Sequence, residues 1–265
     1  MKITVLGSGD TRGTPKLGCS CVVCAWAKKN GFERKRFGLV LESQGARVLL
    51  DASPDLRRSL LALSLAPKDF DAVLLSHEHF DHVAGLGEFS FSGKPIPLFG
   101  RPDALKHLFS DSAYGYLQDF KTFDLRETQF GVAFEVGPFR VTPLEVDHSI
   151  ETQGFLVEAE KKRVGVLTDT RANVLPDALS ALKGVEVLVT DGWLESEAQF
   201  KAAMRSAFSH LPVGVFESEF SKKKLNHLLI LEAKALGERV GAKKNGGVAR
   251  QPRGGHARLV GPSVR

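Results

Sequence analysis

Short runs of β-branched and apolar residues recur along the chain, and glycine or polar residues separate them. Runs of this kind predict β-strands. We expect strands over residues 3–6, 38–41, 48–50, 72–75, 96–99, 139–146, 154–157, 164–167 and 185–189. Apolar residues three and four positions apart, most often with proline near the first turn, predict helices between some of these strands. These helices cover residues 54–65, 102–109, 176–182 and 225–240.

The pattern shows no internal repeat and no linker rich in Gly, Ser or Pro before residue 242. We therefore predict one domain over residues 1–242, followed by a basic, irregular tail over residues 243–265. The chain of 265 residues has a net charge of +5, and the tail carries six Lys and Arg residues without an acid, so the domain itself is close to neutral. Such a tail can contact phosphates non-specifically. It is more often a solvated end, so nucleic acid is not the favoured partner.

Composition also indicates where the protein works. The first residues reach Gly7 before a long apolar region develops, which is typical of a first strand and not of a signal peptide. No segment approaches the apolar length that spans a bilayer. The three cysteines lie together between positions 19 and 24, an odd number that suits a metal in a reducing compartment better than disulfides. We predict a cytoplasmic protein without membrane contact.

The densest cluster of candidate chemistry follows the apolar run at 72–75. It contains His77, His79, Asp81 and His82. In an extended segment residues two apart face the same way, so His77 and His79 can hold one ion while Asp81 and His82 address a second. Imidazole with carboxylate suits zinc, manganese or iron better than calcium or magnesium.

Other polar residues also come directly after predicted strands. Asp51 follows residues 48–50, His148 follows 139–146, and Asp169 follows 164–167. Each alone is weak evidence, because a single His or Asp in a loop is commonly a cap or a surface residue. Their shared placement at strand ends predicts a rigid metal site at one rim of the fold.

These residues resemble the metallo-β-lactamase fold superfamily, whose metal motif has the form His-x-His-x-Asp-His. The resemblance implies an αββα four-layer sandwich, with two mixed sheets face to face and helices outside. It also implies that His77, His79 and His148 hold the first metal, that Asp81 and His82 hold the second, and that Asp169 bridges them. Two divalent ions about 3.5–4 Å apart can share a water, lower its pKa and stabilise an in-line displacement at phosphorus. Asp81 can in addition orient the resulting hydroxide.

A second motif, formed by Cys19, Cys21 and Cys24 after a glycine-rich opening, narrows the resemblance. Three thiolates so close can surround one structural zinc, which requires a fourth ligand from elsewhere. The glycine-rich opening with Cys-x-Cys-x-x-Cys resembles the branch that contains phosphoribosyl 1,2-cyclic phosphate phosphodiesterases. By that resemblance, His227 contacts the substrate phosphate or protonates the leaving alkoxide, and His210 is its rival for this role.

The chain departs from this branch near its end. Relatives carry a Thr-His-x-Ser-His segment whose histidines complete the second metal site and the cysteine site, whereas here Arg250 and Arg253 occupy that region. A guanidinium cannot bind a dication because it stays protonated. The region after Lys244 is a corrupted or frame-shifted stretch, His256 replaces one ligand, or the second metal is lost or weakly held.

The leading prediction is a metal-dependent hydrolase of a small cyclic or nucleotide-like phosphodiester, with two Zn or Mn ions at the active site. A ribonuclease resembling the transfer-RNA 3′-processing enzymes is an alternative, although no long RNA-gripping arm is evident. A non-catalytic or cofactor-biosynthesis protein resembling the pyrroloquinoline quinone relatives is another, and the missing histidines favour it. The sequence leaves open whether the protein forms a homodimer.

Overall fold

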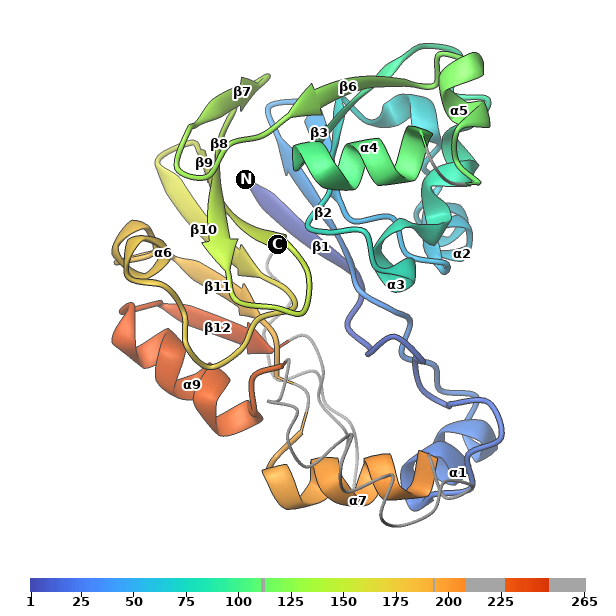
Figure 1. Ribbon diagram of the computed structural model, residues 1–265, viewed down its shortest axis with the longest axis vertical. Helices are drawn as coiled ribbons and strands as arrows, with labels where there is room; N and C mark the ends of the chain where they lie inside the picture. The colour runs from blue at the N-terminus through green and yellow to red at the C-terminus, as the bar shows by residue number, and fades with distance from the viewer. Residues whose placement is uncertain (111–112, 193, 208–226, 248–265) are drawn as a thin grey trace.

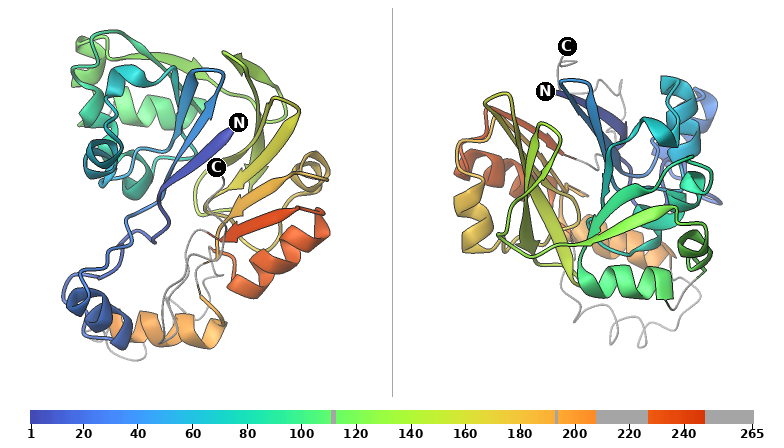
Figure 2. Two further views of the ribbon diagram at one scale, coloured as in Figure 1. Left: turned by 180° about the vertical axis from the view of Figure 1, so that it is seen from behind. Right: turned by 90° about the horizontal axis from the view of Figure 1, so that it is seen from above.

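Two six-stranded β-sheets pack face to face, and helices cover their outer sides (Figure 1, Figure 2). The computed structural model describes residues 1–110, 113–192, 194–207 and 227–247. The first sheet has the order β1 (Lys2–Gly7), β2 (Gly38–Ser43), β3 (Ala46–Leu50), β4 (Ala72–Leu74), β5 (Ile96–Gly100), β6 (Phe123–Glu127). The second has the order β12 (Lys244–Gly247), β11 (Val187–Thr190), β10 (Lys162–Leu167), β9 (Thr152–Ala159), β8 (Phe139–Val146), β7 (Phe134–Val136).

The helices form the outer layers. Figure 2 shows one group beside the first sheet and another beside the second, so the predicted αββα sandwich is confirmed. Beside the first sheet lie α2 (Leu56–Leu63), α3 (Phe80–Val83), α4 (Pro102–Ser110), α5 (Tyr116–Asp119) and the 3₁₀ turns η1 (Pro67–Asp69) and η2 (Ala84–Phe89). Beside the second lie α6 (Pro176–Ala181) and α9 (Ile230–Arg239).

The core explains why the strands read as continuous apolar runs. In β3, Val48 and Leu50 join the cluster between the sheets, whereas Leu49 joins the cluster under the outer helices. Both faces of such a strand are covered, so alternation between apolar and polar residues is lost. A third cluster packs α6 and α9 against the second sheet.

Some elements differ from the sequence prediction. The strands β6, β7 and β12 were not predicted, because they are short and rich in charged residues or glycine. The strand β12 pairs in parallel with β11, so ordered structure runs to residue 247, beyond the predicted domain end at 242. Residues 248–265 lie outside the described residues.

The segment between β1 and β2 projects from the sandwich and carries helix α1 (Val22–Lys29) (Figure 1). Its two sides are bridged at Gly9 with Arg36 and at Thr14 with Arg34. The cysteines were expected in a glycine-rich loop, but Cys24 lies inside α1, where its side chain is buried. The helix α7 (Glu197–Ala207) also lies away from the two sheets in Figure 1. No helix of the described segments is long and apolar enough to span a membrane.

Strand directions bring the predicted site residues to one edge. The strand β4 is parallel to β3, and β11 is parallel to β10. Since β9 is antiparallel to both β8 and β10, the carboxyl ends of β8 and β10 also share one edge. A backbone hydrogen bond from Gln153 to the carbonyl of Ser76 joins the two sheets there.

Candidate metal centre

The loop after β4 supplies the first two histidines. The strand is fully buried, and the chain then runs extended through His79, which caps α3 with β-region dihedral angles. His77 is buried and His79 is partly exposed. His77 Nε2 lies 2.9 Å from His79 Nδ1, as expected for residues two apart in an extended segment.

Two further strand ends complete the cluster. His148 follows β8, and its Nε2 lies 3.4 Å from His79 Nδ1. Asp169 follows β10, and its Oδ2 lies 3.7 Å from both His77 Nε2 and His148 Nε2. One ligand atom from each of these four residues lies within 4.8 Å of the other three.

This donor set fits a divalent cation. Tetrahedral bonds of 2.0–2.1 Å to zinc place the ligand atoms about 3.3 Å from each other, and the separations above are close to that distance. Burial and the neighbouring charge on His82 hold the pKa of His77 well below its usual range. Burial also lowers the pKa of His79. Neutral imidazoles have a free lone pair for a metal, so the electrostatics favour ligation.

Asp51 holds Ser76 and His82 in place beneath the histidine cluster. It follows β3, is fully buried, and adopts a left-handed conformation with φ of 58°. Its carboxylate accepts hydrogen bonds from the Ser76 amide and hydroxyl, both at 2.8 Å, and from His82 Nδ1 at 2.7 Å. Although burial opposes a charge on His82, Asp51 and Asp169 raise the pKa of its imidazole well above the usual range.

The bond to Asp51 leaves His82 Nε2 directed toward two other carboxylates. It lies 3.5 Å from Asp81 Oδ2 and 3.5 Å from Asp169 Oδ2. A histidine fixed through Nδ1 presents Nε2 as a ligand in a set orientation. The predicted residues of the second metal, Asp81, His82 and Asp169, are therefore adjacent in space.

His227 lies beside this cluster, three residues before α9. Its Nδ1 donates to Asp191 Oδ2 at 2.6 Å and lies 3.9 Å from Asp169 Oδ1. Burial opposes its charge, but Asp191 raises the pKa of His227 to about 9. Burial raises the pKa of Asp191 to about 6, against the lowering effect of His227. Asp169, Asp191 and His227 are themselves close enough to share a cation.

Sequence reasoning missed two residues of this region. Asp191 directly follows β11, as Asp169 follows β10, so its position after an apolar run was a usable signal. Arg171 had no such signal. Its guanidinium donates to Asp147 Oδ1 at 2.5 Å and to the carbonyl of His148 at 3.0 Å, which links the His148 loop to the Asp169 loop.

The cysteines form a separate group in the projecting segment. The Sγ atoms of Cys19, Cys21 and Cys24 lie within 4.8 Å of one another. Burial raises the pKa of Cys24 to about 11. Cys21 is exposed, and although burial opposes it, hydrogen bonds from neighbouring groups lower its pKa. The geometry suits three ligands of a tetrahedral zinc. Four residues discussed in the sequence analysis lie outside the described residues, namely His210, Arg250, Arg253 and His256.

Curated relatives match parts of the chain. It is 29% identical over 202 residues to an octanoyltransferase of Porphyromonas gingivalis, which covers 72% of this chain and 39% of that protein. It is 31% identical over 134 residues to ribonuclease Z of Methanopyrus kandleri, covering 49% of this chain and 46% of that protein. The chain thus spans less than half the length of these curated relatives.

Solved structures cover more of the fold. A diphosphatase from the PhnP family matches with a TM-score of 0.68 and 22% identity, over 92% of this chain and 85% of that one. Zinc-bound PqqB from Methylobacterium extorquens matches with a TM-score of 0.68 and 26% identity, over 77% of this chain and 76% of that one.

The family comparison covers strands of both sheets and the metal loop, residues 77–82. Residues 46–218 match the beta-lactamase superfamily domain, which is more than half of the chain. This stretch contains the His77 to His82 motif together with His148 and Asp169. The αββα sandwich and the histidine cluster at its edge agree with that match. The chain therefore belongs to the metallo-β-lactamase superfamily.

Proposed function

We propose that this protein is a metal-dependent phosphodiesterase that acts on a small cyclic or nucleotide-like phosphodiester. The observation that carries the proposal is the convergence of His77, His79, His148 and Asp169 within 4.8 Å. His227, whose pKa is raised to about 9 by Asp191, lies on the other side of Asp169. The two features together provide a cation site and a proton donor at one edge of the fold.

The chain's own residues divide the work. His77, His79, His148 and Asp169 would hold one divalent ion, zinc or manganese. Asp81, His82 and Asp169 would hold a second, and more weakly, because the described residues supply only these three donors for it. When bound, such ions lower the pKa of water and stabilise negative charge on phosphoryl oxygens. The carboxylate of Asp81 orients the attacking water at this position.

His227 supplies the proton that the leaving group needs. A phosphodiester releases an alkoxide, which requires protonation at neutral pH. With a pKa of about 9, His227 is charged at that pH and can donate to the alkoxide or hydrogen-bond to the phosphate. Asp191 holds the ring through Nδ1, so Nε2 is the atom that faces away from this bond.

The cysteine group and the compartment complete the proposal. Cys19, Cys21 and Cys24 would bind one structural zinc that stabilises the projecting segment. Their reduced state is compatible with a cytoplasmic location. A small substrate is favoured over RNA on the basis of the phosphodiesterase-like opening sequence, and a homodimer is compatible with all of these features.

Hydrolysis of bis-p-nitrophenyl phosphate tests the activity. We expect turnover by the zinc- or manganese-loaded protein, loss of turnover on chelation, and recovery on readdition of metal. His79→Ala should abolish turnover without recovery. Undiminished turnover in a metal-free preparation would contradict the proposal.

A non-catalytic role is the second candidate, and the arginines at positions 250 and 253 favour it. It predicts that the protein binds one cation at His77, His79, His148 and Asp169 but shows no turnover of any phosphodiester. Metal analysis at graded zinc or manganese separates the cases further. We expect one full catalytic equivalent and a second, partly filled one, besides the cysteine zinc, whereas two full catalytic equivalents would contradict a weakened second site.

A further inference from the structure

The backbone carbonyl groups of Leu75 and Ser76 directly precede the metal loop and lie beyond Leu74, the last paired residue of β4. Leu75 still donates its amide to the carbonyl of Phe99 at 2.8 Å, but the β4 ladder ends at Leu74. Leu75 and Ser76 are both buried. A buried carbonyl without a partner is costly, so these two groups require donors from elsewhere.

Gln153 on β9, in the opposite sheet, supplies both donors. Its side-chain amide donates to the carbonyl of Leu75 at 2.7 Å, and its backbone amide donates to the carbonyl of Ser76 at 3.0 Å. Gln153 is fully buried. Because the Leu75 carbonyl can only accept, the side-chain atom that contacts it must be the nitrogen.

Thr128 fixes the other half of the same amide. Its hydroxyl donates to Gln153 Oε1 at 2.8 Å. Thr128 is itself held, since its backbone amide donates to the carbonyl of Gly100 at 2.9 Å and Arg101 donates to its carbonyl. Gln153 is thus held on both polar atoms of its side chain.

The position of Gln153 relates two sources of metal ligands. The carbonyls that it binds immediately precede His77, and His148 lies five residues before Gln153 on the turn between β8 and β9. These two loops come from different sheets, yet His79 Nδ1 and His148 Nε2 must stay 3.4 Å apart. A small shift between packed sheets would change that separation directly.

We propose that Gln153 is a positioning residue that sets the spacing between the His77–His79 loop and the His148 loop. The proposal rests on the proposed function only in treating these histidines as metal ligands. Glutamine is suited to the role because it donates and accepts at once. An ionised glutamate would present only acceptors to the Leu75 carbonyl, and leucine would remove the partner of both the Leu75 carbonyl and the Thr128 hydroxyl.

Hydrogen exchange of the metal-free protein tests the positioning. In Gln153→Leu and Gln153→Glu, we expect the backbone amides of residues 76–82 to exchange at least about tenfold faster than in the wild type, as for a loop released from its anchor. The matched control is Ser92→Ala. Ser92 is also buried and donates to a carbonyl, that of Lys94, which lies two residues further along its own segment. Exchange over residues 76–82 that matches the control would overturn the proposal.

Zinc affinity, measured by competition with a chelator, gives the second readout. Loss of a group that orients metal ligands typically weakens binding by about 10–100-fold, and we expect a change of this size in both Gln153 variants. The control should bind zinc as the wild type does. An unchanged zinc affinity in Gln153→Leu would also overturn the proposal.

Variants of Thr128 provide a second test if the Gln153 variants do not fold. Thr128→Val removes only the hydroxyl that orients the amide, and Thr128→Ser retains it. We expect faster loop exchange and weaker zinc binding in the first and wild-type behaviour in the second, and equal behaviour of the two would count against the role. Absence of phosphodiester turnover in the wild type would refute the proposed function while leaving these readouts intact.

Discussion

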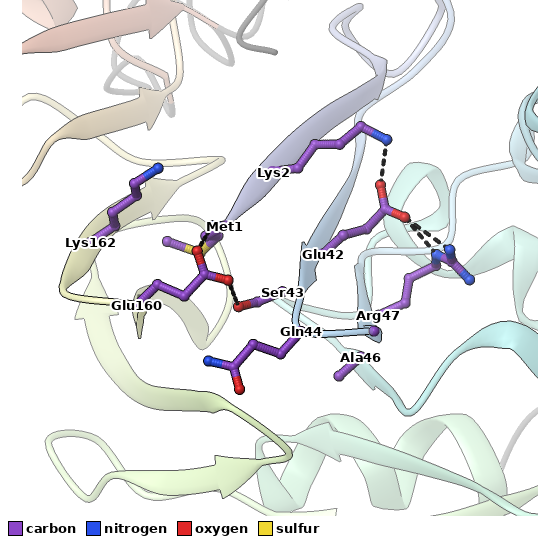
Figure 3. A pocket seen from close by; sticks show the side chains of 10 residues that line it. Met1, Lys2, Glu42, Ser43, Gln44, Ala46, Arg47, Glu160 and Lys162 are labelled. Carbon is purple, nitrogen blue, oxygen red and sulfur yellow. Dashed lines mark hydrogen bonds and ion pairs between the residues drawn. The ribbon is translucent and has the colours of Figure 1, made fainter.

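The two ends of the sandwich differ in how their polar side chains are paired. At the far end, β9 and β10 are joined by a turn at Glu160, and β2 and β3 by a turn at Gln44. These turns line an open pocket of about 390 Å³ (Figure 3). At the opposite end of the sandwich, the loops that follow β4, β8 and β10 carry the cluster of His77, His79, His148 and Asp169.

The far pocket satisfies its own charges. Glu42 accepts from Lys2 at 2.7 Å and from Arg47 at 2.9 Å, and Ser43 donates to Glu160 at 2.6 Å (Figure 3). Each carboxylate there has a donor within the pocket. The metal edge instead brings ring nitrogens together, such as His77 Nε2 and His79 Nδ1 at 2.9 Å, and burial lowers the pKa of both rings.

The difference shows which polar cluster needs a ligand. Paired surface charges stabilise a fold slightly and require nothing more. Converging lone pairs repel each other until a cation or proton lies between them. Polarity alone does not distinguish the two ends, whereas the balance of donors and acceptors does.

Replacement of His77 should give the largest effect. We expect His77→Ala to lower kcat/KM on bis-p-nitrophenyl phosphate by more than about 10³-fold, because metal-ion catalysis is lost with a ligand. Steady-state kinetics and metal analysis check this. Glu42→Gln at the far end is the control and should keep full activity. Near-normal turnover by His77→Ala would remove the distinction between the two ends.

Asp51→Asn should follow in size. Asparagine tolerates the left-handed backbone at this position, so the change removes mainly the charge that accompanies His82. Breaking a buried charged pair costs about 3–5 kcal/mol. We expect a decrease of this order in the free energy of unfolding of the metal-free protein, measured with urea. A loss below about 1 kcal/mol would show that Asp51 and His82 do not depend on each other.

Asp191→Asn should have an intermediate effect on catalysis. Asp191 raises the pKa of His227 to about 9, and the proposed role requires His227 in its protonated form, so wild-type activity should fall as the pH rises through that value. Without the carboxylate the pKa of His227 falls, and the loss of activity moves to lower pH. A kcat profile between pH 6 and 10 checks this, with a decrease of about tenfold or more at pH 8. An unshifted alkaline limb would exclude His227 as the acid.

Glu42→Gln should show the smallest effect, on stability alone. The hydrogen bond from Lys2 lowers the pKa of Glu42 below its ordinary value of 4.5. A carboxylate with a lowered folded pKa stabilises the protein above its unfolded pKa, and this contribution disappears as the pH falls through the folded value. We expect a loss below about 1 kcal/mol at pH 7 that becomes smaller as the pH falls below 4.5. Urea unfolding over this pH range measures it.

Much of the site could be predicted from the sequence. The dense motif at His77 to His82 predicts metal ligands in the loop after β4. His148 and Asp169 also directly follow apolar strands, as that motif does. Asp191 shares that placement, but it stands alone and was overlooked. Gln153 could not have been found, because its role depends on which strand of the second sheet faces Leu75 across the sandwich.

The same distinction holds for the fold. Apolar strands such as β2 are visible because both of their faces are buried. The edge strands β6 and β7 carry charged residues and depend on their neighbours for order, so their sequences resemble loops. Helix α1 was not predicted, because glycines precede it and because its cysteine pattern indicated a loop.

The carboxylate of Asp169 links the metal site to His227. Oδ2 faces the histidines of the metal loop, while Oδ1 faces His227. A cation that withdraws electron density from one oxygen weakens the attraction of the other for the imidazolium. By reciprocity, protonation of the imidazole must disfavour cation uptake to the same extent, so loading the protein with metal in an unbuffered solution should acidify it.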